Sequence, residues 1–313
     1  MAVLTGAAGC SSGSASSSPS PAGTALEQPD ITVAAIQSVT AAGLYIAQQR
    51  GFFADAGLHV TIEPVTGSSP AIPYLVANHV QVVFGNYVSD ILAQAHGVAS
   101  LRFLAAGNVS GPAEQEVVVP PGSPITSPAD LRGKTIGTNA LNNVGTMMMQ
   151  AILATYGVPA SAVHFVQIPF PSEGAALAAH RVDAAYISDP FLTADKQQYG
   201  AKTLFDCDQG AVANLPISGY VTTSSWAARN PRTAAAFVHA LERGQALAGS
   251  DRAAVNTALA AYAGISLKAA EVAAIGTFPV SQQVQPAPLQ RLADLMVQYG
   301  VLKQHFDVTP MTQ

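Results

Sequence analysis

Two segments of the chain, 102 residues apart, repeat one pattern of residue types. Residues 75–84 read LVANHVQVVF and residues 177–186 read LAAHRVDAAY, in each case a helix end, a polar turn and an apolar strand. The similarity extends backwards to residues 57–62 and 162–168, the latter after a helix stopped by Gly157. Self-similarity of this kind predicts two units built on one plan. The alternative is chance similarity between segments rich in alanine and valine.

The first unit opens with a strand, a helix and a second strand within residues 31–65. Residues 31–36 read ITVAAI, an apolar and β-branched run typical of a parallel strand that is covered on both faces. The following helix carries Leu44 and Tyr45, Gly57 ends the next helical turn, and residues 58–63 alternate as a half-covered strand does. This order is a βαβ unit, so the chain belongs to the α/β class.

Two apolar strands mark where the chain passes between the units. Residues 117–119 precede the stiff turn PPGSP, and residues 219–223 form a return strand before a purely helical tail. We therefore expect lobe 1 to comprise residues 31–118 and 222–313, and lobe 2 to comprise residues 119–221. Each lobe is expected to be an α/β unit, and the chain is expected to cross between the lobes near Val118 and Val221.

Composition and missing motifs exclude several function classes. The 313 residues carry a net charge of −5 without a basic stripe, which disfavours nucleic acid as a partner. No run of eighteen apolar residues predicts a membrane-spanning helix. The seven histidines lack metal-binding spacing, so we expect no metal. The Walker and Gly-x-Gly-x-x-Gly motifs are also absent, no Gly-x-Ser-x-Gly elbow follows a predicted strand, and we expect no cofactor.

The amino-terminal residues resemble the end of a bacterial lipoprotein signal. Residues 4–10 read LTGAAGC, with small residues before Cys10, although Ala7 stands where leucine is preferred and the basic region is missing. We expect residues 1–10 to be a partial signal that ends at lipidated Cys10, and residues 11–30 to be a disordered Ser/Pro/Gly linker. The alternative is a disordered tail with a chance cysteine. With Cys10 lipidated, Cys207 has no intrachain partner and is expected to be buried.

Polar residues follow several strands at the edge where the carboxyl ends of parallel strands meet. Open α/β sheets bind ligands at this edge, and hydroxyls, amides and helix starts suit an oxyanion or a polar heterocycle. A plain helix cap is the alternative role for Ser69 and Asp189, whereas ligand contact is favoured for Asn142 and Tyr87. The expected ligand-binding residues are Ser38, Thr40, Ser68, Ser69, Asn86, Tyr87, Asn139, Asn142, Asn143, Ser188 and Asp189.

These loops contain no lysine or arginine, which bears on the kind of ligand. A small anion would depend on helix amino-termini alone, whereas an amine or pyrimidine could use Asp189 and stack on Tyr87 or Phe170. We favour a small, flat, polar organic ligand and keep sulfonates as the alternative.

Four phrases carry a resemblance to a known family: IAQQRGFFADAGL at residues 46–58, VVFGN at 82–86, DLRGKTIG at 130–137, and VDAA at 182–185 leading to Asp189. Over residues 31–308 the chain resembles the substrate-binding proteins of ABC importers, in the group that serves nitrate, sulfonates, taurine and thiamine-pyrimidine precursors. It departs from that family at Asn78 and His180, where glycine is usual, and at Gln81, where aspartate is usual.

The resemblance implies a type 2-like periplasmic-binding-protein fold, in which each lobe is a mixed sheet flanked by helices and hinge strands near Val118 and Val221 join the lobes. Such a two-lobed clamp closes on a ligand and excludes water. It implies an extracytoplasmic lipoprotein, not an enzyme, held to the outer face of the cytoplasmic membrane by its lipid anchor only. Such a protein captures a small polar organic molecule or an oxyanion and delivers it to an ABC permease and its ATPase. We expect a monomer.

Three rival functions share this fold. By resemblance, the yeast-type thiamine pyrimidine synthases use a cysteine-rich iron segment, which a chain with only Cys10 and Cys207 lacks. The menaquinone-pathway enzymes that act on small carboxylates are cytoplasmic, which conflicts with a lipoprotein signal. A ligand-sensing receptor subunit would carry the same sequence features as an importer protein.

Overall fold

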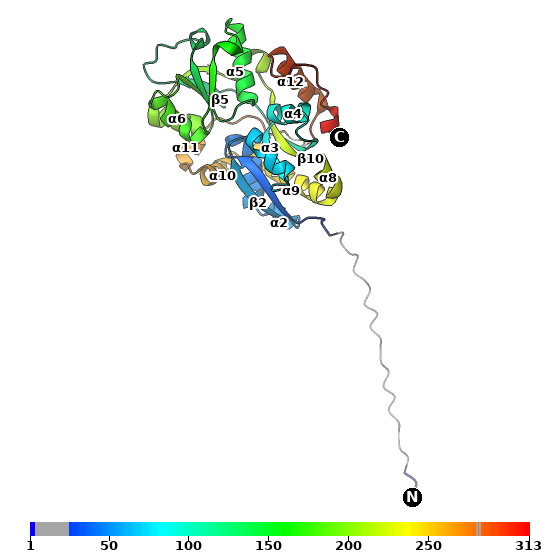
Figure 1. The fold of residues 1–313 in the computed structure, drawn as a ribbon. Coiled ribbons are helices and arrows are strands. Elements are labelled where there is room, and N and C mark those ends of the chain that lie inside the picture. Colours follow the sequence, from blue (N-terminus) through cyan, green and yellow to red (C-terminus); the bar gives the residue numbers. More distant parts are fainter. Residues whose placement is uncertain (4–24, 280, 282) are drawn as a thin grey trace.

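The computed structural model describes residues 1–3, 25–279, 281 and 283–313. These residues form two α/β lobes, one drawn in green and the other in blue, cyan and yellow, with α12 in red beside their junction (Figure 1). Each lobe has a five-stranded sheet that contains both parallel and antiparallel pairs. The predicted architecture of two mixed sheets flanked by helices is confirmed.

Both sheets have the same strand order and the same strand directions. In lobe 1 the order is β2 (His59–Val65), β1 (Asp30–Ile36), β3 (Val82–Asn86), β10 (Pro216–Thr223) and β4 (Leu101–Val109). In lobe 2 it is β7 (His164–Gln167), β6 (Thr135–Thr138), β8 (Ala184–Ser188), β5 (Gln115–Val119) and β9 (Lys202–Asp206). The first three strands of each sheet are parallel and the last two run against their neighbours. The internal repeat in the sequence is therefore a repeat of topology.

Helices cover both faces of each sheet. On one face of lobe 1 lie α1 (Ala42–Gln49), α2 (Phe52–Asp55), α8 (Ser224–Arg229) and α9 (Pro231–Ser250), with α10 (Arg252–Ala263) packed on α1. On its other face lie α3 (Ser68–Val76), α4 (Tyr87–Ala95) and α12 (Pro286–Gln298). Lobe 2 carries α5 (Val144–Thr155), α6 (Phe170–Ala178) and α7 (Phe191–Tyr199), while α11 (Leu267–Val272) contacts both α10 and α7.

Strand β1 shows why the central strands are apolar throughout. Val33 and Ala35 pack with Phe237 of α9 in one hydrophobic cluster, whereas Ala34 belongs to the cluster on the opposite face of the sheet. Successive side chains of a strand point to opposite faces, so a strand that is covered on both sides must be apolar at every position. The cluster that contains Ala34 continues into lobe 2, for example to Ile136 of β6.

Two departures from the family pattern fall at equivalent turns. Asn78 has a backbone φ of 56° and His180 has a φ of 53°, both in the left-handed region where glycine is favoured. Both residues end a helix before a strand, at corresponding places in the two lobes. The turn geometry is thus kept by residues that adopt it less readily than glycine.

The structure corrects the predicted lobe boundaries. Val118 lies in β5, which pairs only with β8 and β9 of lobe 2, and Val221 lies in β10, which pairs only with β3 and β4 of lobe 1. The chain crosses between the lobes at residues 110–114 and 207–215. Both antiparallel strands were assigned to the wrong side of the crossing because an apolar strand next to a turn does not reveal which sheet it joins.

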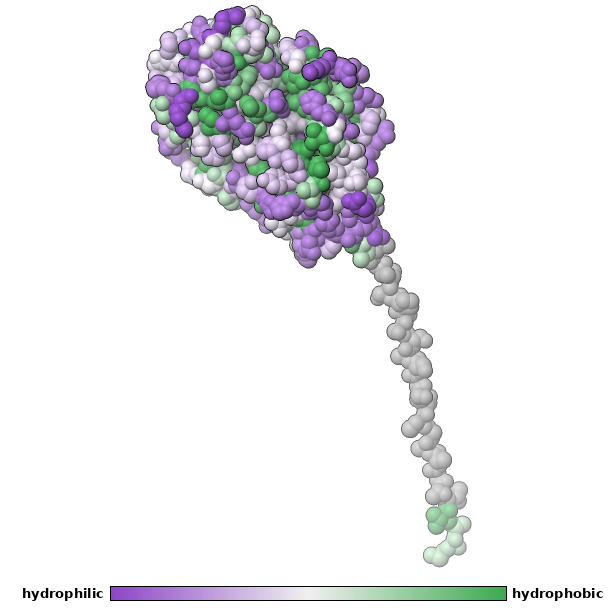
Figure 2. All heavy atoms as spheres, viewed as in Figure 1, coloured by the Kyte–Doolittle hydropathy of each residue, from purple (hydrophilic) through white to green (hydrophobic). Residues whose placement is uncertain are grey.

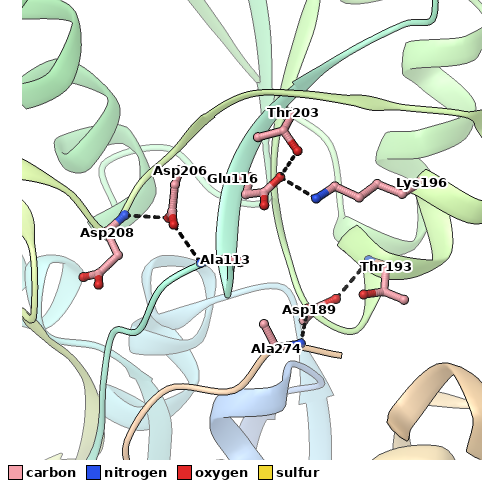
Figure 3. A network of polar contacts seen from close by, with 9 residues as sticks. All are labelled: Ala113, Glu116, Asp189, Thr193, Lys196, Thr203, Asp206, Asp208 and Ala274. Carbon is pink, nitrogen blue, oxygen red and sulfur yellow. Dashed lines mark hydrogen bonds and ion pairs between the residues drawn. The ribbon is translucent and has the colours of Figure 1, made fainter. Parts of the chain in front are cut away.

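Short polar contacts hold the two crossings together. Ser110 donates its backbone N–H to Leu215 O at 2.9 Å, and its hydroxyl lies 2.6 Å from Asp208 Oδ1. Figure 3 shows that Asp206 accepts hydrogen bonds from the backbone N–H groups of Ala113 and Asp208, at 2.7 and 2.9 Å. The hinge is therefore a pair of chain segments that hydrogen bonds hold together.

The described end of the predicted linker is ordered against lobe 1. Leu26 packs on the α9 side of the sheet. The Glu27 carboxylate accepts the backbone N–H of Thr233 at 2.9 Å in the first turn of α9. Desolvation acts to raise the pKa of Glu27, but hydrogen bonds that include those from Thr233 and Arg232 outweigh it, so the pKa is lowered. The prediction of a disordered linker up to residue 30 is thus wrong for residues 25–30, and Cys10 lies outside the described residues.

The surface and helix lengths bear on the membrane question. In the part of the chain that the structure describes, no helix combines the length and the apolar character needed to cross a bilayer. On the face drawn in Figure 2, hydrophobic residues gather in a few small clusters among hydrophilic ones.

Candidate ligand-binding cavity

A cavity of about 40 Å³ lies between the lobes, where the carboxyl ends of their parallel strands face each other. A single water molecule needs about 10–15 Å³ on the same measure, so this cavity suits a few waters or a ligand of a handful of non-hydrogen atoms. The lining residues are Ile36, Ser38, Thr40, Gly67, Gly85, Asn86, Gln115, Asn139, Asn143, Val144, Phe170, Tyr186, Ser188, Ile217 and Ser218.

Six of the eleven residues expected to bind ligand line this cavity. They come from the loops after β1 and β6 and from the last residues of β3 and β8, as expected for an open α/β sheet. These six are Ser38, Thr40, Asn86, Asn139, Asn143 and Ser188.

Tyr87 is a core residue and does not line the cavity. Its side chain is 2% exposed, and its ring packs edge-on against Phe103 with 4.9 Å between centroids. The first residue of a helix that follows a strand can turn to either side, and here the opposite side offers an aromatic partner.

Ser68, Ser69 and Asn142 also lie outside the cavity. Ser68 is fully buried, and its hydroxyl accepts the backbone N–H of Asn86 at 2.8 Å. Ser69 and Asn142 line a separate groove of about 400 Å³ between α3, α4, α5 and residues 299–301. Asn142 is exposed and has a φ of 53°, so its side chain is directed by a left-handed turn that the sequence did not reveal.

Asp189 has a structural role, because its carboxylate joins two segments of the chain. Its Oδ1 atom accepts the backbone N–H of Thr193 at 2.9 Å, and its Oδ2 atom accepts that of Ala274 at 2.6 Å (Figure 3). Burial raises the pKa of this carboxyl, against the lowering effect of those hydrogen bonds. Both oxygens are therefore engaged, and the expected contact between Asp189 and an amine ligand is not supported by the geometry.

Three of the lining residues that sequence reasoning missed come from the antiparallel return strands. Gln115 begins β5, and Ile217 and Ser218 lie near the start of β10. Tyr186 lies inside β8, and Phe170, noted above as a stacking partner, begins α6. A polar residue such as Gln115 or Ser218 in an otherwise apolar strand was the available signal.

Several hydrogen bonds join the two lobes around the cavity. Asn139 Nδ2 donates to Thr66 O at 2.7 Å, and Val39 N donates to Asp189 O at 3.0 Å. Val144 N, the first residue of α5, donates to Asn86 Oδ1 at 3.2 Å. The structure is therefore in a closed arrangement.

The four amide side chains of the cavity use their oxygens for contacts within the protein. Asn86 Oδ1 accepts from Ser89 N and Val144 N, and Asn143 Oδ1 accepts from Thr146 N. Asn139 Oδ1 accepts from Asn143 Nδ2 at 2.9 Å, and Gln115 Oε1 accepts from the Tyr186 hydroxyl. Because backbone N–H groups must face an oxygen, this network fixes the orientation of Asn86 and Asn143 and, through Asn143, that of Asn139.

The cavity amides can still offer N–H donors to a ligand. Each amide nitrogen has two protons, of which Asn139, Asn143 and Gln115 use one each in the described residues and Asn86 uses none. The start of α3, at Gly67, has no side-chain cap and lies on the same cavity. Hydroxyl groups can serve as donors or acceptors, so the cavity as a whole favours a hydrogen-bond acceptor.

The described residues that line the cavity include no lysine, arginine, histidine, aspartate or glutamate. Three buried acids are chain neighbours of lining residues: Glu114 and Glu116 beside Gln115, and Asp189 beside Ser188. Glu116 is paired with Lys196, and burial raises the pKa of Glu114 to about 8. A carboxyl in that state is mostly neutral at pH 7. The cavity therefore acts through neutral dipoles.

Among the described residues, no group of three or more histidine, cysteine, aspartate or glutamate side chains is arranged to hold a metal ion.

Comparison with known proteins gives the family. The NMT1/THI5 like family profile matches residues 38–254, which is more than half of the chain. The chain belongs to the NMT1/THI5-like family. A search of curated protein sequences finds no match.

Solved structures share the NMT1/THI5-like chain's fold at low sequence identity. The alkanesulfonate-binding protein SsuA from Xanthomonas axonopodis pv. citri, bound to MOPS, is 21% identical with a TM-score of 0.79, over 92% of this chain and 99% of that one. The periplasmic nitrate-binding protein NrtA from Synechocystis PCC 6803 is 14% identical with a TM-score of 0.75, over 90% and 84%. A DSZB mutant in complex with biphenyl-2-sulfinic acid is 18% identical with a TM-score of 0.60, over 88% and 94%. These matches establish the periplasmic-binding-protein fold for this NMT1/THI5-like chain.

Proposed function

We propose that this protein is an extracytoplasmic solute-binding protein of an ABC importer. It captures a small solute whose polar head accepts hydrogen bonds, such as an oxyanion, in the cavity between its lobes. The closed form then presents a surface made by both lobes to a permease and its ATPase. The family and the fold of the sulfonate-binding and nitrate-binding neighbours support this proposal.

The observation that carries the ligand class is the state of the cavity amides. Their oxygens are occupied by protein donors, while N–H groups of Asn86, Asn139 and Asn143 are left over. A donor-only ligand such as an alkylamine would find few acceptors, and Asp189 is engaged elsewhere. The expectation of a flat organic ligand that uses Asp189 is replaced by an acceptor-headed ligand that contacts the amides.

The residues at the cavity argue for binding over catalysis. No described lining residue is a cysteine, histidine or carboxylate, which are the groups that most often act as nucleophile or general base. The lining hydroxyls of Ser38 and Thr40 bond to each other at 2.6 Å, and no hydrogen bond joins either hydroxyl to a histidine or a carboxylate among the described residues. We therefore propose a transport role in place of an enzymatic one.

A thermal-shift panel on the full chain tests the proposal. Sulfonates, nitrate and carboxylates are compared with amines and pyrimidines. An acceptor-headed compound at 100 times its Kd should stabilise the fold by about 2–3 kcal/mol through mass action. Stabilisation by amines alone would overturn the ligand class, and no shift with any compound would overturn the binding function.

A charged variant tests whether the compound binds in the cavity. Ser188→Asp puts a carboxylate into the wall and should abolish the shift given by an anionic head group, because like charges repel in a poorly hydrated space. Ser225→Asp makes the same change at an exposed position of α8 and should leave the shift intact. Equal shifts for both variants would mean that the compound binds elsewhere.

The anchor is a separate part of the proposal. We propose that Cys10 is lipidated and holds the protein at the outer face of the cytoplasmic membrane as a monomer. Mass spectrometry of membrane-extracted protein should find a diacylglycerol-modified amino-terminal cysteine. A chain that retains an unmodified Met1 would remove the anchor.

A further inference from the structure

The side chain of Asn86 makes hydrogen bonds to both lobes. It is the last residue of β3 and the residue before α4 in lobe 1, it is 9% exposed, and it lines the cavity. Its backbone N–H donates to the Ser68 hydroxyl at 2.8 Å, which fixes the position of the main chain. Gly85 fits beside that serine only because it has no Cβ, since a Cβ there would lie 1.7 Å from Ser68 Oγ.

The amide oxygen of Asn86 caps one helix from each lobe. Oδ1 accepts the backbone N–H of Ser89 in α4 at 2.9 Å and that of Val144 in α5 at 3.2 Å. A carbonyl oxygen has two lone pairs, so both bonds can form at once. The second bond joins the lobes and exists only when they are closed, whereas the first persists in any arrangement.

The amide nitrogen of Asn86 is left for the ligand. With the oxygen held by two backbone donors, Nδ2 must point away from both helix starts. No described residue accepts a hydrogen bond from it. The neighbouring amides differ, because Asn139 Nδ2 and Asn143 Nδ2 each already donate one proton to a protein oxygen.

We propose that Asn86 couples ligand recognition to lobe closure, its oxygen tying α5 to lobe 1 and its nitrogen donating to the ligand's acceptor atom. This inference rests on the proposed binding function. A ligand acceptor on Nδ2 holds the amide plane in the orientation that Val144 N requires. Ligand and closure then stabilise each other through one rigid planar group, which is the differential contact that a ligand needs in order to shift a population.

The test separates the oxygen from the nitrogen with two variants. Asn86→Asp keeps an acceptor for both backbone N–H groups and is as good a helix cap as asparagine, but it cannot donate. Asn86→Ala removes the acceptor and the donor. Closure is measured as the distance between spin labels on Tyr74→Cys in lobe 1 and Tyr156→Cys in lobe 2, two exposed positions. The full chain carries Cys10→Ser so that residue 10 takes no label, and Cys207 is buried.

The probe is the tightest binder among methanesulfonate, nitrate and acetate. Without probe, we expect a closed population in the wild type, an equal or larger one in Asn86→Asp, and a smaller one in Asn86→Ala. Affinity for the probe should fall at least tenfold in both variants, while the melting temperature of Asn86→Asp is maintained. Because the added carboxylate also repels an anion, binding is measured as well with dimethyl sulfone, a neutral acceptor. Loss of its binding with retained closure and stability is the signature that neither a mere helix cap nor charge repulsion would give.

Three results overturn the inference. Asn86→Asp that binds the probe as tightly as the wild type would show that the nitrogen does not contact it. A wild type with no closed population without probe, or Asn86→Ala closed as often as the wild type, would show that the oxygen is no tie. If no probe binds the wild type, the proposed function fails, and the label distances still decide whether Asn86 ties the lobes.

Discussion

Gln81 and Asp183 accept the same hydrogen bond in the two lobes. Gln81 Oε1 accepts the backbone N–H of Thr32 at 2.7 Å, and Asp183 Oδ2 accepts that of Thr135 at 2.8 Å. Thr32 lies in β1 and Thr135 in β6, the strands that hold the same place in the two sheets. Gln81, one of the departures from the family pattern, thus performs with an amide the role that Asp183 performs with a carboxylate.

This equivalence predicts equal costs of removal. Gln81→Ala and Asp183→Ala should each lower the free energy of unfolding by about 1–3 kcal/mol, because a partly buried backbone N–H loses its acceptor. Asp183→Asn keeps an acceptor and should cost less than Asp183→Ala. Urea unfolding of the four proteins measures the differences, and alanine variants as stable as the parent would contradict the shared role.

Asp189 should matter for stability more than for affinity. In Asp189→Asn one carboxylate oxygen becomes an NH₂ group that faces a backbone N–H of Thr193 or Ala274, so one hydrogen bond is lost. We expect a lower melting temperature and a Kd within about threefold of the wild type, following the loss of one bond outside the cavity. An unchanged melting temperature with strongly weakened binding would place Asp189 at the ligand.

Two buried acids in lobe 2 predict a pH dependence of stability. Glu173 in α6 and Asp195 in α7 are buried, and neither Glu173 oxygen has a hydrogen-bond partner within the described residues. Burial, with the nearby carboxyl adding to it, raises the pKa of Glu173 well above its usual range, and burial raises that of Asp195 to about 7.

The folded state therefore holds protons that the unfolded chain releases. This contribution to stability is fully present below the unfolded pKa values of about 4 and is lost as the pH rises through the folded ones. The melting temperature should fall between about pH 5 and pH 8. Glu173→Gln should flatten this fall, whereas Glu242→Gln, at an exposed position, should not. A melting temperature that rises over this range would contradict the assignment.

Two aromatic residues distinguish the cavity from the hydrophobic core. Phe170 lines the cavity, whereas the Tyr87 ring lies against Phe103 on the other side. We expect Phe170→Leu to weaken binding several-fold, since the wall loses contact area, and Tyr87→Phe to leave Kd unchanged. Titration calorimetry measures both. Weakened binding in Tyr87→Phe with wild-type affinity in Phe170→Leu would restore the sequence-based assignment.

The fold was largely predictable from the sequence because recognisable turns and helix ends flank its strands. The apolar run of β1 and the repeated helix ends before β3 and β8 are local signals with one physical reading. The lobe boundaries were not predictable, because β5 and β10 pair with strands that lie far away in the sequence, and no local pattern shows which sheet they join.

The position of the cavity at the strand ends was predictable, but the full set of side chains that line it was not. Position after a strand identified Ser38, Asn86 and Asn143, since the topology brings those strand ends together. Which way a side chain turns was decided by tertiary contacts, as Tyr87 and Asp189 show. The use of the amide oxygens depends on helix starts in both lobes, which no local pattern contains.

A crystal structure of the full chain with the acceptor-headed compound that gives the largest thermal shift tests the central claim most directly. We predict density for the compound between the lobes, with an acceptor atom within hydrogen-bond distance of Asn86 Nδ2 and a second one near Asn139 or Asn143. A compound bound outside this cavity, or one whose donors face the amides, would contradict the account.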